Sequence, residues 1–184
     1  GYLFGGDADR LDMATLDILT VPDERLRQVA EPVSGFDDAL RARIADLEET
    51  RRAGPAAVGI AAPQVGHFQR IVIVDVSGRK NTANHGHMVL VNPEIAHWEG
   101  FEIGREGCLS VPDYTGNVIR ATRIRLTACD PYGKALEYEM EGFEARAVQH
   151  EIDHLDGLLF VDRVVSRRTD LFRRKVYQKG GRPR

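Results

Sequence analysis

Apolar positions recur with two different periods along the chain, and together they predict both helices and strands. Leu40, Ile44 and Leu47 recur at steps of three and four residues, which predicts a helix from 37 or 38 to about 52. β-branched runs and alternation of apolar with polar residues predict strands at 70–76, 88–92, 94–103 and 134–140, and a strand or one bent half of a hairpin at 118–129. The chain therefore combines helical segments with a larger number of strands.

A second helical pattern begins near Phe143 and ends at Asp156-Gly157, where a glycine is typical of a helix C-terminus. Its core stripe is formed by Val148, Ile152 and Leu155. The adjacent stripe contains Phe143, Ala147, His150, Glu151 and His154. We therefore expect the face that carries the two histidines to lie half-buried beside the core.

Three further stretches are interpreted from composition. Trp98 and Phe101, within the predicted strand 94–103, are interpreted as core or pocket aromatic residues. Residues 158–161 predict a short strand. In the tail, Leu171, Phe172 and Val176 predict an amphipathic helix with a basic outer face.

Length and composition favour one soluble globular domain. The 184 residues are 42% hydrophobic and 29% charged with a net charge of −3, and no apolar run approaches the roughly 18 residues of a membrane span. We expect a leader or disordered extension at 1–12, a catalytic domain at 13–165 and a basic helical tail at 166–184. The small number of cysteines, two, fits a reducing compartment, so we expect the protein in the cytoplasm or an organelle matrix. We expect no membrane partner.

The stretch His150-Glu151-Ile152-Asp153-His154 has the pattern H-E-x-x-H. A helix brings both imidazoles to one face, roughly 6 Å apart along the axis, where they can share one metal ion. Glu151 then lies close enough to act on a metal-bound water, which indicates metal-assisted hydrolysis. The alternative is a polar helix face that holds these residues by chance.

A catalytic metal site of this kind needs a third protein ligand. No histidine or glutamate follows His154, and Phe160 stands where the metzincin pattern has its third histidine. The ligand must come from upstream, and the candidates are a carboxylate, Cys108, His67, His85, His87 and His97. Cys108 follows Gly107 near a strand end, although a cysteine in such a position is more often a small buried residue than a ligand. His85 and His87 are interpreted as solvated loop residues.

Three segments, Val58–Gln64, Glu106–Ser110 and Gln149–His154, resemble the three signature motifs of peptide deformylase in the family's order. The segment Ile18–Arg27 is also similar to that family's amino-terminal sequence, and the resemblance covers about residues 14–165. One departure is Ala57, where the first motif commonly has glycine. The resemblance implies an α+β fold, with antiparallel sheets packed around a central helix that carries H-E-x-x-H.

The resemblance also implies the reaction, which is hydrolytic removal of the formyl group from N-formylmethionyl nascent polypeptides with release of formate. Cys108, His150 and His154 would hold one divalent ion, typically Fe²⁺ in the cell, with Zn²⁺, Ni²⁺ or Co²⁺ as replacements. Glu151 would be the general base. The side chain of Gln64 and the backbone N–H of Leu109 would stabilise the oxyanion.

For the substrate, the resemblance implies a peptide that pairs with the backbone of Gly59 as an added strand. The residues expected to bind it are Val58, Gly59, Ile60, Glu106, Gly107, Phe143, Arg146 and Ala147. Alternatively, Glu106 forms a buried pair with Arg120. We expect a monomer whose basic tail docks on the ribosome or is a solvated surface. The rival functions are a zincin-type metallopeptidase and an inactive deformylase-like metal-binding protein.

Overall fold

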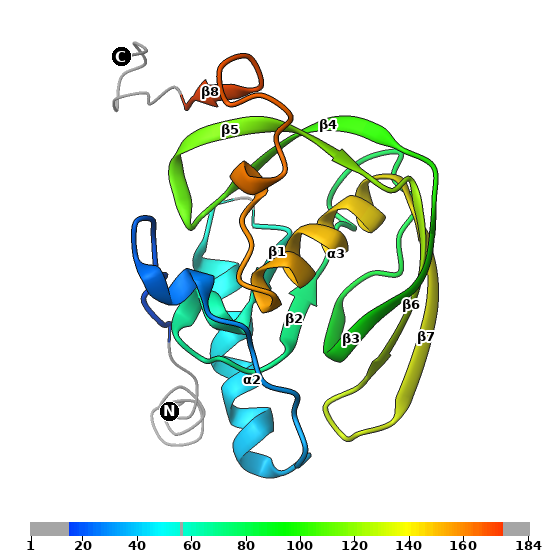
Figure 1. The fold of residues 1–184 in the computed structure, drawn as a ribbon. Coiled ribbons are helices and arrows are strands. Elements are labelled where there is room, and N and C mark those ends of the chain that lie inside the picture. Colours follow the sequence, from blue (N-terminus) through cyan, green and yellow to red (C-terminus); the bar gives the residue numbers. More distant parts are fainter. Residues whose placement is uncertain (1–14, 56, 175–184) are drawn as a thin grey trace.

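The structure is a computed structural model that describes residues 15–55 and 57–174. The strands of these residues form two antiparallel sheets (Figure 1). The five-stranded sheet has the order β1 (Gly59–Ala61), β2 (Ile71–Val74), β3 (Met88–Glu99), β6 (Arg123–Cys129) and β7 (Ala135–Glu141). The three-stranded sheet has the order β4 (Glu102–Cys108), β5 (Val111–Arg120) and β8 (Leu171–Arg173).

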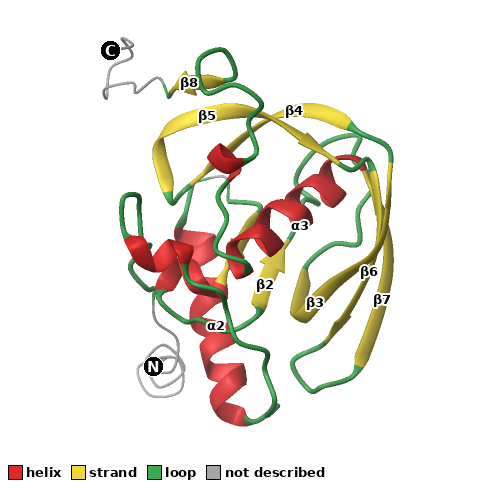
Figure 2. Cartoon of the chain, viewed as in Figure 1, coloured by secondary structure: helices red, strands yellow, loops and turns green. Residues whose placement is uncertain are grey.

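Two α-helices and three 3₁₀ turns complete the described chain (Figure 2). The helices are α2 (Asp38–Ala53) and α3 (Gly142–Leu155), and the turns are η1 (Glu24–Arg27), η2 (Ala62–Val65) and η3 (Phe160–Asp162). The Asp37 side chain accepts a hydrogen bond from the backbone N–H of Leu40, so the predicted start of the first helix is confirmed. None of the described helices has the length and hydrophobicity needed to cross a membrane.

Strand β2 lies between the two α-helices and is buried along its whole length. Its residues alternate in direction, as strand geometry requires. Ile71 and Ile73 belong to the apolar cluster on the α2 side, which includes Leu47. Val72 and Val74 belong to the cluster that includes Val148 of α3. The run of β-branched residues therefore reflects burial on both faces of the sheet.

Helix α3 lies between the two sheets, and eleven of its fourteen residues are buried (Figure 1). This burial exceeds the half-buried placement expected from its stripes. The helix ends as predicted, with Gly157 at a φ of 73° and the Leu158 N–H bonded to the Asp153 carbonyl. A Cβ at residue 157 would lie 2.3 Å from the Arg27 carbonyl oxygen, so this position requires glycine. The predicted α+β fold around the H-E-x-x-H helix is confirmed.

Strand β3 differs from its prediction in two ways. It continues through Pro93, with a register shift after Val91 and a positive φ of 50° at Asn92, whereas the sequence predicted two strands. Trp98 and Phe101 are 59% and 83% exposed, so the core alternative was wrong, whereas both residues line a surface pocket beside Ile152, as the other alternative predicted. From Glu94 onward only Ile95 is half-buried, because this end of β3 continues beyond the packed core.

Two other predicted segments differ in their outcome. Residues 118–129, predicted as a strand or one bent half of a hairpin, are bent at 121–122, where the chain passes from β5 in one sheet to β6 in the other. Residues 158–161 form no strand, and Phe160 begins the turn η3 instead. Phe160 is fully buried beneath the three-stranded sheet together with Leu159. Apolar composition alone could not separate a buried turn from a buried strand.

The tail also departs from its prediction over the described part. Leu171 and Phe172 lie in strand β8, where a helix was expected, and they pair with Gly116 and Thr115 of β5. Pairing with the exposed edge of β5 satisfies backbone groups that an isolated short helix would leave to water. Val176 and the rest of 175–184 lie outside the described residues, as does the predicted leader at 1–12.

Candidate active site

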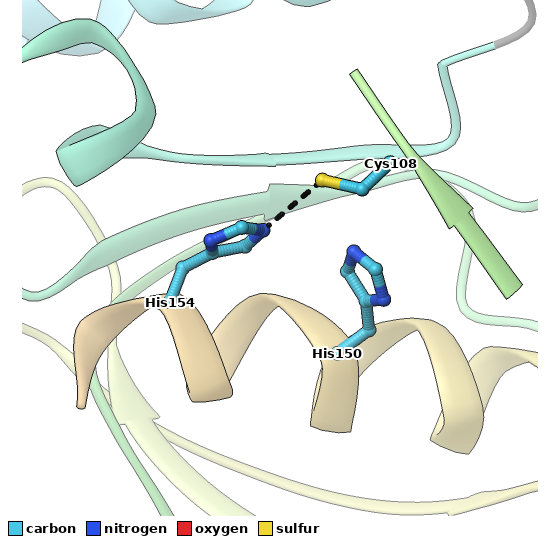
Figure 3. A group of neighbouring side chains, drawn as sticks. All are labelled: Cys108, His150 and His154. Carbon is cyan, nitrogen blue, oxygen red and sulfur yellow. Dashed lines mark hydrogen bonds between the residues drawn. The ribbon is translucent and has the colours of Figure 1, made fainter. Parts of the chain in front are cut away.

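Helix α3 and the end of strand β4 place three potential ligands together. His150 and His154 lie one turn apart on α3, and Cys108 is the last residue of β4 (Figure 3). One ligand atom from each residue lies within 4.8 Å of the other two, and all three residues are buried. Cys108 Sγ is 3.3 Å from His154 Nε2. No other group of this kind occurs among residues 15–55 and 57–174.

The four other histidines considered as ligands, including His67, lie outside this group, and three of them contact acidic side chains. His85 Nδ1 is 2.5 Å from Glu144 Oε1, and His87 Nε2 is 2.5 Å from Glu48 Oε2. Both histidines are exposed, as predicted. His97 is exposed as well, and its Nε2 is 3.2 Å from Glu99 Oε1. The geometry therefore favours Cys108 as the third ligand.

The Cys108 thiol lies in surroundings that favour its ionised form. Burial raises its pKa, but the neighbouring imidazoles of His154 and His150 outweigh burial and hold the pKa well below its ordinary value. Two imidazoles and one thiolate are a common ligand set for a catalytic divalent ion that keeps one position open. The residues present therefore fit a metal ion.

Glu151 adjoins the three potential ligands and lacks a partner for one oxygen. The side chain is buried, and Oε1 has no hydrogen-bond partner among the described residues. Burial raises the pKa of this carboxyl group. A Cβ at residue 59 would lie 2.7 Å from Glu151 Oε2, so Gly59 makes room for the carboxylate. A buried, unpartnered carboxylate oxygen is the arrangement expected of a group that receives its partner with the substrate.

The side chain of Gln64 is held in one orientation by the surrounding residues. Its Oε1 accepts a hydrogen bond from the Ala61 N–H at 2.9 Å, and its Nε2 donates to Ser110 Oγ at 3.0 Å. The same Nε2 is 3.5 Å from Cys108 Sγ. The amide N–H groups of this buried side chain therefore face the potential ligands.

A cavity of about 280 Å³ opens onto these residues. All of the predicted substrate-binding residues line it except Ile60, and Gln64, Leu109 and Glu151 line it as well. The Ile60 side chain is fully buried in the apolar cluster on the α2 side, so only its backbone remains available to a peptide. Strand alternation places it there, because Gly59 and Ile60 face opposite sides of the sheet.

Comparison with known proteins identifies the family. The family model for polypeptide deformylase matches residues 15–170. The chain is 47% identical to a peptide deformylase from Alkalilimnicola ehrlichii, over 89% of this chain and 90% of that protein. The chain belongs to the polypeptide deformylase family. Its members are metal-dependent, and the membership confirms the predicted deformylase activity over the zincin-type alternative.

Solved deformylase structures share the fold. A peptide deformylase from Legionella pneumophila has a TM-score of 0.75 and 43% identity, covering 82% of this chain and 86% of that one. A class I type b peptide deformylase from Acinetobacter baumannii, solved with bound Met-Ala-Ser, has a TM-score of 0.75 and 36% identity, covering 82% of this chain and 99% of that one. The fold is therefore shared with these deformylases over 82% of the chain.

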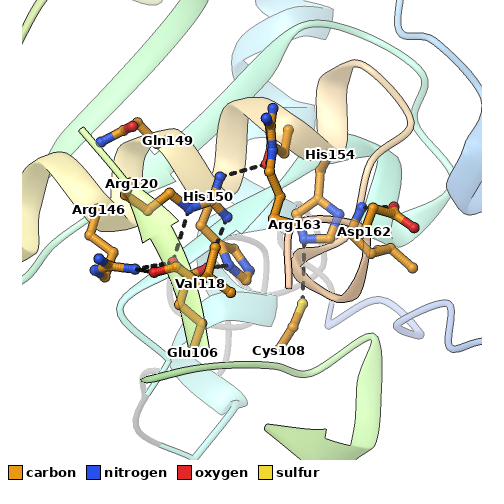
Figure 4. A network of polar contacts seen from close by, with 12 residues as sticks. Glu106, Cys108, Val118, Arg120, Arg146, Gln149, His150, His154, Asp162 and Arg163 are labelled. Atoms are coloured by element: carbon orange, nitrogen blue, oxygen red, sulfur yellow. Dashed lines mark hydrogen bonds and ion pairs between the residues drawn. The ribbon is translucent and has the colours of Figure 1, made fainter. Parts of the chain in front are cut away.

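In this deformylase a buried ionic network supports His150 (Figure 4). Glu106 accepts two hydrogen bonds from Arg120, at 2.9 and 2.8 Å, and lies 2.8 Å from His150 Nδ1. Burial alone would raise the pKa of Glu106. The hydrogen bonds from Arg120 and His150 outweigh burial and hold this pKa well below its ordinary value. An ionised Glu106 makes His150 Nδ1 the donor, which leaves Nε2 free to bind a metal.

The network extends beyond the pair that the sequence suggested. Arg146 donates to Glu106 at 2.7 Å, and Arg120 also donates to Asp153 at 2.6 Å. Asp153 accepts two further hydrogen bonds from Arg163, at 2.9 and 2.8 Å. The sequence reading missed Asp153 and Arg163, although an aspartate beside the core stripe of a helix indicates a buried cationic partner.

We expect Glu106→Gln to weaken metal binding by about 10- to 100-fold, because His150 loses the carboxylate that orients its ring. The free energy of unfolding should fall by about 1.5–3 kcal/mol, since Arg120 keeps Asp153 but loses one of its two carboxylates. Metal titration and chemical denaturation measure the two effects. Glu102→Gln, an exposed position on the same strand, is the control, and unchanged metal affinity in Glu106→Gln would contradict the orienting role.

Proposed function

We propose that Cys108, His150 and His154 hold one divalent metal ion, and that Glu151 is the general base for hydrolysis of the formyl group. The observation that carries this proposal is the close grouping of the three ligands beside the unpartnered Oε1 of Glu151 at the end of one cavity. Together they provide a ligand set, a proton acceptor and room for a substrate. The remaining question is how the surrounding residues take part.

The ion, when bound, supplies a water of lowered pKa and polarises the formyl carbonyl. We infer that Fe²⁺ is the ion in the cell, as the family resemblance implies and a thiolate ligand permits, and that Zn²⁺, Ni²⁺ or Co²⁺ can replace it. The thiolate also makes the centre sensitive to oxidation. Metal analysis of anaerobically purified protein tests the identity of the ion.

Glu151 performs the proton transfers in this proposal. Its Oε1 accepts a proton from the attacking water and passes it to the departing amine of methionine. Burial raises its pKa, which brings the acceptor closer to neutral pH, where it both accepts and returns a proton effectively. The C–N bond of the formamide breaks, and formate leaves with the oxygen of that water.

Gln64→Glu should lower kcat by about 10²–10³-fold, because the carboxylate cannot donate a hydrogen bond to the developing oxyanion. The Leu109 backbone N–H is the second proposed donor and remains in this variant. Steady-state kinetics with a formylated tripeptide measures the change. Gln69→Glu is the control, because Gln69 lies outside the cavity. A comparable loss of kcat in this variant would show that the effect is not specific to Gln64.

We propose that the peptide binds along β1. This strand is at an edge of its sheet and, among the described strands, pairs only with β2, so its other edge can accept an added strand at Gly59. The methionine side chain would enter the apolar part of the cavity, near Phe143, Ala147 and Val58. The bound Met-Ala-Ser in the Acinetobacter baumannii relative supports this substrate class.

Release of formate from formyl-Met-Ala-Ser tests the proposed function directly. We expect formate to be released by metal-loaded protein, and no cleavage of the same peptide without its formyl group. Peptide-bond cleavage without formate would instead support a zincin-type peptidase. Metal binding without either activity would support an inactive deformylase-like protein.

A monomer in the cytoplasm or an organelle matrix is the proposed working form. The three potential ligands, Glu151 and the cavity are all formed by residues of one chain, which supports this proposal. A free thiolate ligand is stable in a reducing compartment. Sedimentation of the metal-loaded protein tests the monomer, and an active dimer that loses activity on dilution would contradict it.

We also propose that the basic tail docks on the ribosome. Truncation after Arg174 keeps β8 but removes Lys175, Lys179, Arg182 and Arg184. Co-sedimentation with ribosomes should weaken in this variant, and in the full chain it should weaken with added salt, because cations that bind phosphates displace counterions. An unchanged sedimentation profile after truncation would support the alternative, a solvated tail.

A further inference from the structure

Two arginines at the rim of the catalytic cavity have no ionic partner among the described residues. Arg105 belongs to β4, and Arg174 directly follows β8; both line the cavity. A third arginine of the lining, Arg146, differs from these two because it forms an ion pair with Glu106. The hydrogen bonds of the Arg105 side chain go only to the neutral groups Asn117 Oδ1 and Thr115 Oγ1, at 3.1 and 3.3 Å.

The fold holds both guanidinium groups on the outer face of β4. Strand alternation directs Glu106 and Cys108 inward, so Arg105 and Gly107 face outward. A Cβ at Gly107 would lie 2.5 Å from Arg174 Nη2, which places that guanidinium directly against the strand. The Arg105 guanidinium stacks 3.8 Å from the centre of the Phe172 ring. The strand β8 therefore brings a second positive charge to the rim beside the first.

The position of Arg105 relative to Cys108 matches the reach of a bound peptide. Arg105 precedes Cys108 by three residues, which corresponds to roughly 10 Å along a strand. An extended peptide with its formyl group near the ligands covers the same length with its next three residues. A guanidinium fork is shaped to bind a carboxylate.

We propose that Arg105 and Arg174 form a subsite for an acidic side chain within the three residues that follow formyl-methionine. This inference rests on the deformylase activity and adds a substrate preference to it. A peptide carboxylate is favoured over an RNA phosphate, because the pair lines the cavity that receives the peptide. The two like charges repel each other in the free protein, and one carboxylate between them removes that repulsion.

The test compares formylated peptide amides that carry either glutamate or glutamine at position 2, 3 or 4. Amidation removes the terminal carboxylate as a second source of charge. For the metal-loaded full chain we expect kcat/KM to be about 3- to 10-fold higher with glutamate at the best position, and this ratio should shrink with added salt. Arg105→Gln and Arg174→Gln should each lower the ratio, and the double variant should bring it to about one.

Arg173→Gln is the matched control, because it removes the same charge from the neighbouring residue, which does not line the cavity. An equal loss of the ratio in this variant would overturn the subsite in favour of a general field effect. A wild-type ratio of one at all three positions would also overturn the subsite. If ribosome binding were then weakened in Arg174→Gln but not in Arg173→Gln, the arginine pair would be assigned to RNA phosphates. Formate from neither peptide would instead overturn the activity on which the inference rests.

Discussion

Glu151→Gln lowers kcat/KM for formyl-Met-Ala-Ser by about 10²–10⁴-fold, the range expected when a general base is lost. Glutamine has nearly the same shape, so the close approach to Gly59 is kept. Its amide cannot take a proton from the attacking water. Glu151 is not one of the three grouped ligands, so the variant should bind metal like the wild type.

The measurement is formate release together with metal content, both on the same preparation. Glu137→Gln is the control, because Glu137 is exposed on β7 and the substitution changes net charge by the same amount. Loss of activity with loss of metal would mean that Glu151 supports the centre and is not its base. Full activity with full metal would remove the proposed base altogether.

The sequence predicted the chemical core of the site because that core is encoded locally. His150, Glu151 and His154 depend only on helix periodicity, and Gly157 marks the end of the helix. Cys108 could be chosen over four histidines only through the resemblance to a family. The structure supplies an independent reason, because Cys108 alone of these candidates reaches both motif histidines.

Other features depend on contacts between distant segments, which no local pattern encodes. Glu106 and Asp153 are separated by 47 positions in the chain and share Arg120, so neither could be placed in a network by periodicity. The strand β8 exists because β5 offers it an edge. Composition left Trp98 open between the core and a pocket, and only the structure shows that the end of β3 that carries it lies outside the core and lines a surface pocket.

Cys108→Ala should weaken metal binding by about 100-fold or more, because it removes a ligand, whereas loss of a group that only orients a ligand already costs 10- to 100-fold. At limiting metal concentration, the rate of formate release should fall in parallel with the bound metal. The substitution also removes the buried thiolate that contacts His154. Metal titration of the apoprotein, with formate release at each point, measures both effects.

Cys129→Ala is the matched control, because the second cysteine is half-buried and lies outside the ligand group. It should bind metal and release formate like the wild type. Full metal occupancy in Cys108→Ala would mean that another residue is the third ligand. Loss of metal in both variants would indicate general damage to thiol-dependent folding. If Cys108→Ala loses metal and Glu151→Gln retains it, Cys108 is a metal ligand and Glu151 is not, although both line the same cavity.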